Sequence, residues 1–247
     1  MSLIWTSILF FAGALLYSIA GFGGASFYLA ILTLTSVPLE QITIIALACN
    51  IMVVSASSCS YIRNGHFRWH DAWPFLITSV PLAWAGGHIH LPASPHKILL
   101  GFVLLISGAA IYIQAHPLER GALRVMPRAT AALIGAGLGM LSGITGIGGG
   151  VFLTPILTFR RWGSAKQTAA ISAIFILLNS ASGLVARADG AMCSVMEHYW
   201  PLLLTVWAGG ELGGRLGALR FRQLTIRQIS SGVVCSSGVR LLLSALV

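Results

Sequence analysis

The sequence predicts an all-α integral membrane protein, a polytopic helix bundle made of two inverted-topology repeats of about five segments each. The first observation is composition: the 247 residues are 56% hydrophobic and only 9% charged. Soluble domains carry about 25% charged residues, so the bilayer is the expected solvent. The second observation is a series of ten apolar segments, and the third is a match between the two halves of the chain.

The ten apolar segments differ in length. A helix that spans a bilayer needs about 20 residues. Eight segments approach that length, whereas the second and seventh are short and each follows a glycine cluster. We therefore expect eight long helices and two short, broken or re-entrant ones. The segments are 3–20, 24–36, 41–62, 73–91, 97–115, 128–145, 149–160, 166–186, 199–218 and 228–246.

The first segment resembles a signal peptide in one respect, because "SIA" precedes Gly21. It lacks a basic n-region, however, and it has a counterpart later in the chain. We therefore predict that residues 3–20 form a transmembrane segment.

The two halves match at residues that rarely coincide by chance. A shift of 125 places the cluster "GFGG" (21–24) on the glycines of "GIGG" (146–149), and "SAS" (55–57) on "SAS" (180–182). A shift of 127 places the Trp-Pro pair at 73–74 on the pair at 200–201. We expect a single transmembrane domain over 1–247. Its parts are repeat one (1–115), a connection (116–127) and repeat two (128–247).

The basic residues follow the positive-inside pattern of a membrane protein, so the net charge of +9 does not indicate nucleic acid as a partner. Eleven basic residues lie in loops after odd-numbered segments, and two, Lys97 and Arg187, lie in the other loops. This asymmetry predicts both termini outside and 116–127 in the cytoplasm. Five segments per half is an odd number, so the second half must enter the membrane inverted. The eleven are Arg63, Arg68, Arg120, Arg124, Arg128, Arg160, Arg161, Lys166, Arg220, Arg222 and Arg227.

Several kinds of site are not indicated. The four cysteines form no CxxC pair, so neither a disulfide framework nor a zinc site is expected. His88 and His90 point apart on a helix and have no evident third ligand, so no metal is predicted. "GIGGGVF" lacks the strand–helix setting and full spacing of a nucleotide-binding loop. We expect no cofactor.

The glycine clusters predict breaks in the helices near the middle of the membrane. Non-helical backbone at that depth is tolerated only where it is buried or lines a wet cavity. Each cluster is followed by a short helix, whose N-terminal amides are unpaired and carry partial positive charge. Two such ends could converge on one anion. The alternative is that the glycines serve only close helix packing.

The paired glycine breaks, "P-x-L-x-F" at Pro155–Phe159, the Ser/Asn-rich helices that follow and the "WP…GG" helices resemble the TauE/SafE sulfite-exporter-like permeases. The resemblance covers nearly the whole chain. It implies an inner-membrane, multi-pass carrier of small sulfur-containing or carboxylate anions, often for export. The first half departs from the pattern, since "GFGGAS" has fewer glycines than "TGIGGG" and no proline matches Pro155.

We expect a permease for a small oxyanion, most of all sulfite or an organosulfonate, that works by alternating access. The alternatives are an anion channel of the same architecture and a membrane-embedded enzyme, although no catalytic motif is present. The expected partners are the anion, the lipid bilayer and, as an open possibility, a second copy in a homodimer. The candidate substrate-binding residues are Gly21, Gly23, Gly24, Ser26, Asn50, Ser57, Thr145, Gly146, Gly148, Gly149, Gly150, Asn179, Ser182 and Arg240.

Two charged positions inside predicted segments have competing interpretations. Glu211 is the candidate for proton coupling, but it lies four residues before Arg215 and the two side chains could simply neutralise each other. Arg240 offers a countercharge to the anion or extends to the outer surface.

Overall fold

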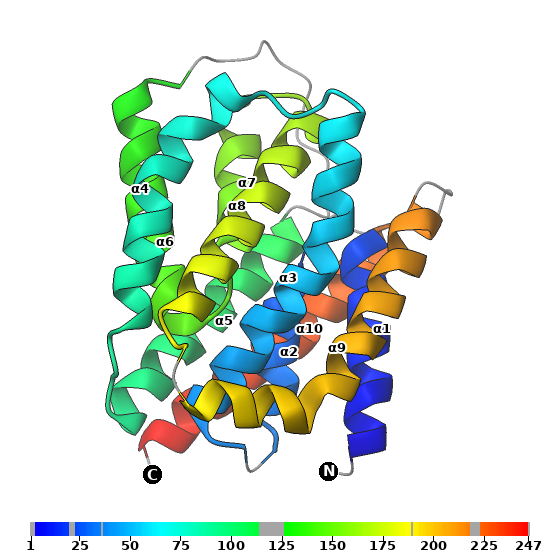
Figure 1. Cartoon of the computed structure of the whole chain (residues 1–247), viewed down its shortest axis with the longest axis vertical. Coiled ribbons are helices and arrows are strands. Elements are labelled where there is room, and N and C mark those ends of the chain that lie inside the picture. Colours follow the sequence, from blue (N-terminus) through cyan, green and yellow to red (C-terminus); the bar gives the residue numbers. More distant parts are fainter. Residues whose placement is uncertain are drawn as a thin grey trace.

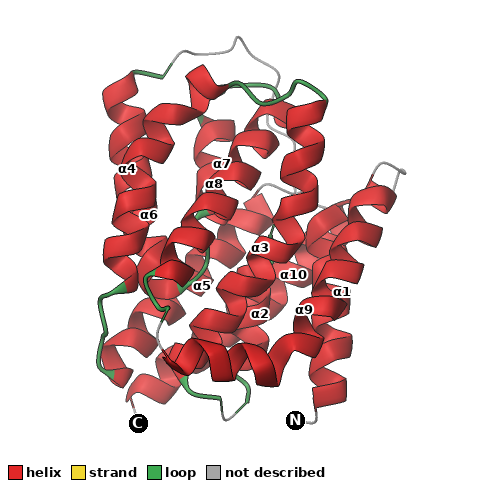
Figure 2. Cartoon of the chain, in the orientation of Figure 1, coloured by secondary structure: helices red, strands yellow, loops and turns green. Residues whose placement is uncertain are grey.

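The computed structural model describes residues 3–19, 23–35, 37–113, 126–188, 190–217 and 223–246, and these form ten helices and no strand (Figure 1, Figure 2). The predicted all-α class is confirmed. The helices are α1 (Leu3–Ile19), α2 (Ala25–Leu32), α3 (Leu39–Arg63), α4 (Trp69–Gly87), α5 (Ala93–Ile113), α6 (Arg128–Thr145), α7 (Gly150–Phe159), α8 (Ala165–Val185), α9 (Gly190–Gly217) and α10 (Gln223–Leu246).

Three of the described helices are long and apolar enough to cross a bilayer: those over Leu39–Arg63, Ala93–Ile113 and Lys166–Val185. Shorter apolar helices accompany them, among them Ile4–Ser18, Gly150–Phe159 and Val234–Ala245. The expected short elements are present, because α2 has 8 residues and α7 has 10.

Helix α9 differs from its predicted segment, because it begins at Gly190 and not near residue 199. Its first part runs across the lower end of the bundle in Figure 1, and its second part rises beside α1. Met192 and Met196 in the first part pack against the buried core. Pro201 lies inside the helix, where the missing amide proton removes a backbone hydrogen bond and permits a bend. The first part contains both polar and apolar residues, so a search for continuous apolar segments does not find it.

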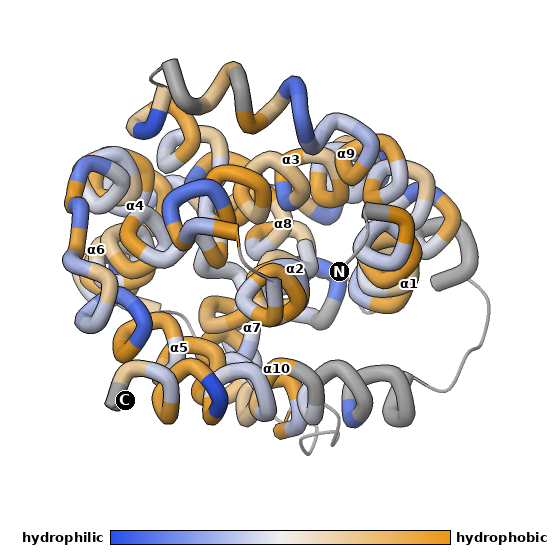
Figure 3. Tube along the Cα trace, turned by 90° about the horizontal axis from the view of Figure 1, so that it is seen from below, coloured by the Kyte–Doolittle hydropathy of each residue, from blue (hydrophilic) through white to orange (hydrophobic). Residues whose placement is uncertain are grey.

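The bundle has a centre and three outer pairs. The pairs are α1 with α9, α4 with α6, and α5 with α10, while α3 packs on α8. Seen from below, α2 and α7 lie near the middle (Figure 3). All eight residues of α2 are buried. Helix α2 is therefore enclosed by the rest of the protein, whereas α7 is mostly buried but exposed at its C-terminal end, where Phe159 is 53% exposed.

These contacts keep their pattern when each helix is exchanged for the one five places away. The α1–α9 pair then becomes the α6–α4 pair, and the α3–α9 contact becomes the α8–α4 contact. One contact repeats at residue level. A Cβ atom added to Gly86 would meet the carbonyl oxygen of Met140, and one added to Gly213 would meet that of Leu15. Met140 follows Leu15 by 125 positions, the shift found in the sequence.

Glycines allow α6 to approach α4 closely. Gly135, Gly139 and Gly143 recur every fourth residue, so they lie along one face of α6. A Cβ atom at any of the three would strike the backbone of α4. Small residues commonly permit such close contact between membrane helices.

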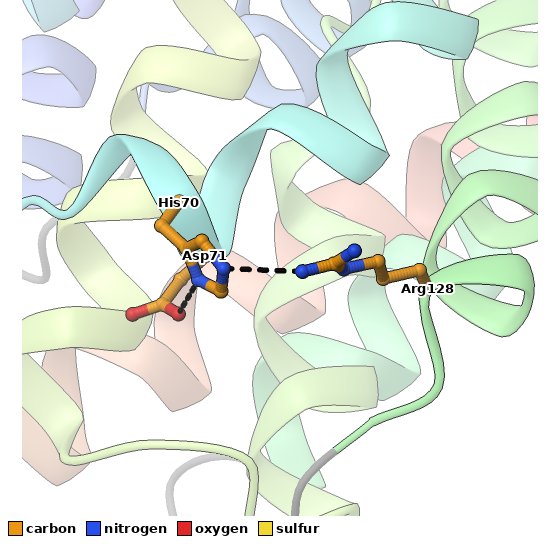
Figure 4. Close-up of polar contacts among 3 residues, drawn as sticks. All are labelled: His70, Asp71 and Arg128. Atoms are coloured by element: carbon orange, nitrogen blue, oxygen red, sulfur yellow. Dashed lines mark hydrogen bonds and ion pairs between the residues drawn. The ribbon is translucent and has the colours of Figure 1, made fainter.

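One end of the bundle gathers basic and aromatic side chains. Arg128, at the start of α6, donates from Nη2 to Nε2 of His70 in the first turn of α4 (3.2 Å), and Nδ1 of His70 lies 3.4 Å from Oδ1 of Asp71 (Figure 4). Trp162, between α7 and α8, meets the ring of Phe75 edge-on at 6.3 Å between centroids. The starts of α4 and α6 and the 160–164 loop therefore share an end, while both marked termini lie at the opposite end (Figure 1).

Candidate functional site

The second glycine cluster is a sharp break between α6 and α7. Gly146 ends α6 with φ of 75°, and its amide donates to the carbonyl of Ser142 at 2.8 Å. Gly148 and Gly149 have φ of 79° and 75°, and Gly149 is the N-cap of α7. Residues other than glycine rarely adopt this left-handed backbone conformation, because it costs them about 1–2 kcal/mol. Glycine is therefore needed to turn the chain here.

The first cluster leads into α2 in the same way. Helix α1 ends at Ile19, and Gly24, with φ of 85°, is the N-cap of α2. Gly21 lies outside the described residues. Gly24 and Gly149 have no side chain with which to cap the short helices that they begin.

Asn50, in the middle of α3, connects the two breaks. Its Oδ1 accepts a hydrogen bond from the amide of Ala25 at 3.1 Å, which is the first residue of α2. Its Nδ2 donates to the carbonyl of Ile147 in the second break and to Oγ of Ser180 on α8, both at 3.2 Å. The residue is only 1% exposed. A single buried carboxamide therefore touches both breaks.

In each break, a glycine lies directly against this carboxamide. A Cβ atom on Gly23 would collide with Oδ1 of Asn50, and one on Gly148 would collide with its Nδ2. Two further glycines are crowded by aromatic rings. A Cβ on Gly24 would lie 2.9 Å from the hydroxyl of Tyr28, and one on Gly149 would lie 2.8 Å from Phe175. Gly23 and Gly148, one from each half, therefore lie against the same carboxamide.

The N-terminus of α7 presents unused amides. The amides of Phe152 and Leu153 both donate to the carbonyl of Gly149 at 3.1 Å. Among the described residues, none accepts from the amides of Gly150 and Val151. These groups carry the partial positive charge of a helix start, in a region where Val151 is 3% exposed. Such an end can hold an anion.

Several buried polar atoms near the breaks have no hydrogen-bond partner. They include the hydroxyls of Ser26, in the first turn of α2, and Ser142, in the last turn of α6. Oδ1 of Asn179 is a third, because this side chain uses only its Nδ2, which donates to the carbonyl of Phe175 at 2.8 Å. A buried polar atom without a partner carries a desolvation cost that a ligand or a water can offset.

In three other predicted residues, the side-chain hydroxyl donates a hydrogen bond to a helix carbonyl. Oγ1 of Thr145 donates to the carbonyl of Leu141 at 2.7 Å, and Ser57 donates to that of Val54 at 3.0 Å, each within its own helix. Ser182 donates across to α4, to the carbonyl of Val80 at 2.7 Å. The structure does not bring these hydroxyls to Asn50.

The two charged candidates lie on other helices than Asn50. Arg240 is exposed on α10, and Glu211 is partly buried on α9, the helix that packs on α1 and α3. The side chain of Arg215 lies outside the described part of the chain. In the described residues, no group of three His, Cys, Asp or Glu side chains could hold a metal ion.

Two polar residues of this region are absent from the predicted set. Ser180 is buried and contacts Asn50. The clue in the sequence is that the shift of 125 aligns Ser180 with Ser55. Arg187 donates to the carbonyls of Gly143 and Ile144, at the end of α6. The clue in the sequence is that Arg187 lies in one of the loops that carry few basic residues.

Comparison with known proteins identifies the family. The family model "Sulfite exporter TauE/SafE" matches residues 6–241. A "Probable membrane transporter protein y4hK" from Sinorhizobium fredii is 35% identical over 245 residues, which cover 97% of this chain and 98% of that protein. A "Probable membrane transporter protein" from Xylella fastidiosa is 27% identical over 189 residues, 71% of this chain and 69% of that protein.

No solved structure matches the chain. The match to the family model extends over both glycine breaks and includes all or most of each of the ten helices. The chain is therefore a membrane protein that belongs to the sulfite exporter TauE/SafE family.

Proposed function

We propose that this protein carries a small oxyanion, sulfite or an organosulfonate, across the cell membrane by alternating access. The observation that carries the proposal is the meeting of both glycine breaks at Asn50. Its carboxamide oxygen accepts at the start of α2, as an oxyanion would. The bare amides of Gly150 and Val151 add donors from the opposite half of the chain. Backbone amides bind an anion without the tight hold of a full charge, so the cargo can leave. The carboxamide of Asn50 would join them by exchanging one of its two Nδ2 hydrogen bonds, to Ile147 or to Ser180, for one to the anion.

An inverted repeat supports alternating access, because two halves of opposite orientation can exchange conformations. The equivalent contacts of Gly86 with Met140 and of Gly213 with Leu15 support such a repeat. So does the pattern of helix contacts, which survives the exchange of the halves. In this proposal the bundle rearranges about the two breaks. The halves do not move as separate bodies, because α1–α9, α4–α6 and α5–α10 each pair a helix of one half with a helix of the other.

The proposed orientation has the basic end of the bundle in the cytoplasm and both termini outside. Support comes from the gathering of Arg128, Trp162 and the start of α4 at one end, as positive-inside loops and interfacial aromatics require. Single cysteines at Ser2 and at Arg68, in a cysteine-free background, should react oppositely with an impermeant thiol reagent added outside. Labelling of both from outside would contradict this orientation.

The carrier is tested by flux into proteoliposomes that contain the purified protein. Uptake of sulfite, sulfoacetate, thiosulfate, sulfate and small carboxylates is measured against concentration. A carrier saturates, whereas a channel of the same architecture conducts without saturation. Saturable flux of at least one oxyanion is expected, and its absence for all of them would overturn the proposal.

Two variants at Asn50 test the site itself. Asn50→Ala removes the link between the breaks, and Asn50→Asp keeps the acceptor but places a negative charge where the anion binds. We expect both to lose binding of the transported anion, with the aspartate variant losing more. Asn50→Asp variants that are folded and still bind the anion with wild-type affinity would show that the anion lies elsewhere.

A further inference from the structure

Three helix C-termini meet beside the second glycine break. Helices α4, α6 and α8 end at Gly87, Thr145 and Val185. Their backbones are close because glycines line the junction. A Cβ atom on Gly143 would lie 2.9 Å from the amide nitrogen of Gly87, and one on Gly183 would lie 3.8 Å from the Cα of Gly143. The last carbonyls of three helices therefore crowd into one small region.

Arg187 places its guanidinium among these ends. Its Nη1 donates to the carbonyl of Gly183 on α8 at 2.9 Å, and its Nη2 donates to the carbonyls of Gly143 (2.6 Å) and Ile144 (3.3 Å) on α6. A Cβ atom on Gly87, the last residue of α4, would lie 3.1 Å from Nη1. The accepting carbonyls belong to final helical turns, which lack partners within their own helices.

The charge of Arg187 matters because of what lies next to it. Each helix C-terminus carries about half a negative charge, and that of α6 is followed at once by the break. An anion at the N-terminus of α7 would be repelled by these ends. Burial lowers the pKa of Arg187 to about 10, and Glu40, in the first turn of α3, opposes that shift. The guanidinium is therefore charged at neutral pH.

We propose that Arg187 is a positioning residue that sets the charge preference of the anion site: it offsets most of the negative charge at the ends of α4, α6 and α8, so that the positive end of α7 dominates the field at the anion. This inference rests on the proposed function. It predicts that Arg187 favours divalent over monovalent oxyanions, because its Coulomb energy with the anion is proportional to the charge of the anion.

The test compares sulfoacetate, which carries two negative charges, with methanesulfonate, which carries one. Their dissociation constants are measured by titration calorimetry on the purified full-length protein and its variants. Arg187→Gln keeps donors for the carbonyls and removes the charge. It should weaken methanesulfonate binding about fifteenfold and sulfoacetate binding about 250-fold, for a charge about 10 Å away at an effective dielectric constant near 20. Arg187→Lys keeps the charge and should stay within about threefold of the wild type.

Two further variants keep the proposal open to refutation if Arg187→Gln does not fold. Glu40→Gln removes an exposed negative neighbour of Arg187 and should strengthen sulfoacetate binding about twofold, more than methanesulfonate binding. Arg63→Gln, at the exposed end of α3, is the matched control and should change neither.

The outcomes separate this inference from the proposed function. Equal weakening of both anions by Arg187→Gln, or equal losses in the glutamine and lysine variants, would mean that Arg187 is only a hydrogen-bonding cap and would overturn the inference. A wild type that binds neither anion nor any other oxyanion of the flux assay would overturn the proposed function, and this inference with it.

Discussion

The two glycine breaks occupy equivalent places in the two halves, but they are built differently. In the second break, Gly146, Gly148 and Gly149 all have positive φ, and α7 continues for 10 residues with Pro155 inside. In the described part of the first break, Gly24 is the residue with positive φ, and α2 has 8 residues without a proline. The backbone path is thus repeated while the means of turning it differ.

The surroundings of the breaks differ in charge as well. Near the first break, the hydroxyl of Ser18 donates to the carbonyl of Gly210 at 2.7 Å and joins α1 to α9. At the second break a cation, Arg187, joins α6 to α8. The comparison teaches that two breaks with a similar backbone path can differ in side chains: in the proposed site one half would supply a polar side chain, Asn50, and the other a charge, Arg187.

The largest expected effect comes from comparing the two breaks with two substitutions that impose the same backbone strain. Gly148→Ala and Gly24→Ala both force a Cβ into a left-handed conformation, at a cost of about 1–2 kcal/mol in stability. The alanine at 148 also strikes Asn50, whereas that at 24 meets the hydroxyl end of Tyr28. We expect oxyanion affinity to fall about a hundredfold in Gly148→Ala and about tenfold in Gly24→Ala.

The measurement is anion titration of both purified variants, after melting temperatures have shown that each is folded. A folded Gly148→Ala variant with unchanged affinity would mean that this glycine serves packing alone. Equal losses in the two variants would remove the difference that we assign to the breaks.

The second prediction concerns charges that only one half carries. Glu211 and Arg215 on α9 correspond, by the shift of 127, to Trp84 on α4 and His88 directly after it, whose rings lie 4.3 Å apart between centroids. If the α9 pair is structural, the double variant Glu211→Gln with Arg215→Gln should transport better than either single variant, because an uncompensated charge in the membrane is costly. Flux is measured at equal amounts of inserted protein. A folded double variant without flux would assign proton coupling to Glu211.

The smallest expected effect compares two serines that the repeat pairs. Ser180 is buried and receives a hydrogen bond from Asn50, whereas Ser55 is exposed and donates to Met52 of its own helix at 2.9 Å. Ser180→Ala should weaken anion binding about threefold to tenfold, since one hydrogen bond of about 1 kcal/mol that orients Asn50 is lost. Ser55→Ala should leave affinity unchanged. Equal effects of the two would detach Ser180 from the site.

Much of the fold follows from local features of the sequence. Apolar runs and glycine clusters locate all ten helices, and the short α2 and α7 follow from the glycines that precede them. The start of α9 at Gly190 was missed, because residues 190–198 lie along the end of the bundle and have no continuous apolar run. Local hydropathy predicts segments that are buried in lipid, so it does not predict a helix that runs across the end of the bundle.

The site is less predictable, because it depends on which face of each helix turns inward. Asn179 and Ser180 are neighbours in sequence but point about 100° apart on α8. Only Ser180 contacts Asn50, while the amide of Asn179 bonds within its own helix. Asn50 was a candidate, yet its central place depends on contacts with residues 97 and 130 positions away. Periodicity alone does not fix such pairings.

The position of Asn50 has a consequence for the energetics of the proposed cycle. The residue 125 positions after Asn50 is Phe175, so the second half has no carboxamide at the matching place. Two identical halves would give inward-facing and outward-facing states of equal free energy. In the proposed site only one half supplies a carboxamide, so exchange of the halves would not regenerate the same site. We therefore expect the two orientations of the empty protein to differ in free energy, and their affinities for the anion to differ as well.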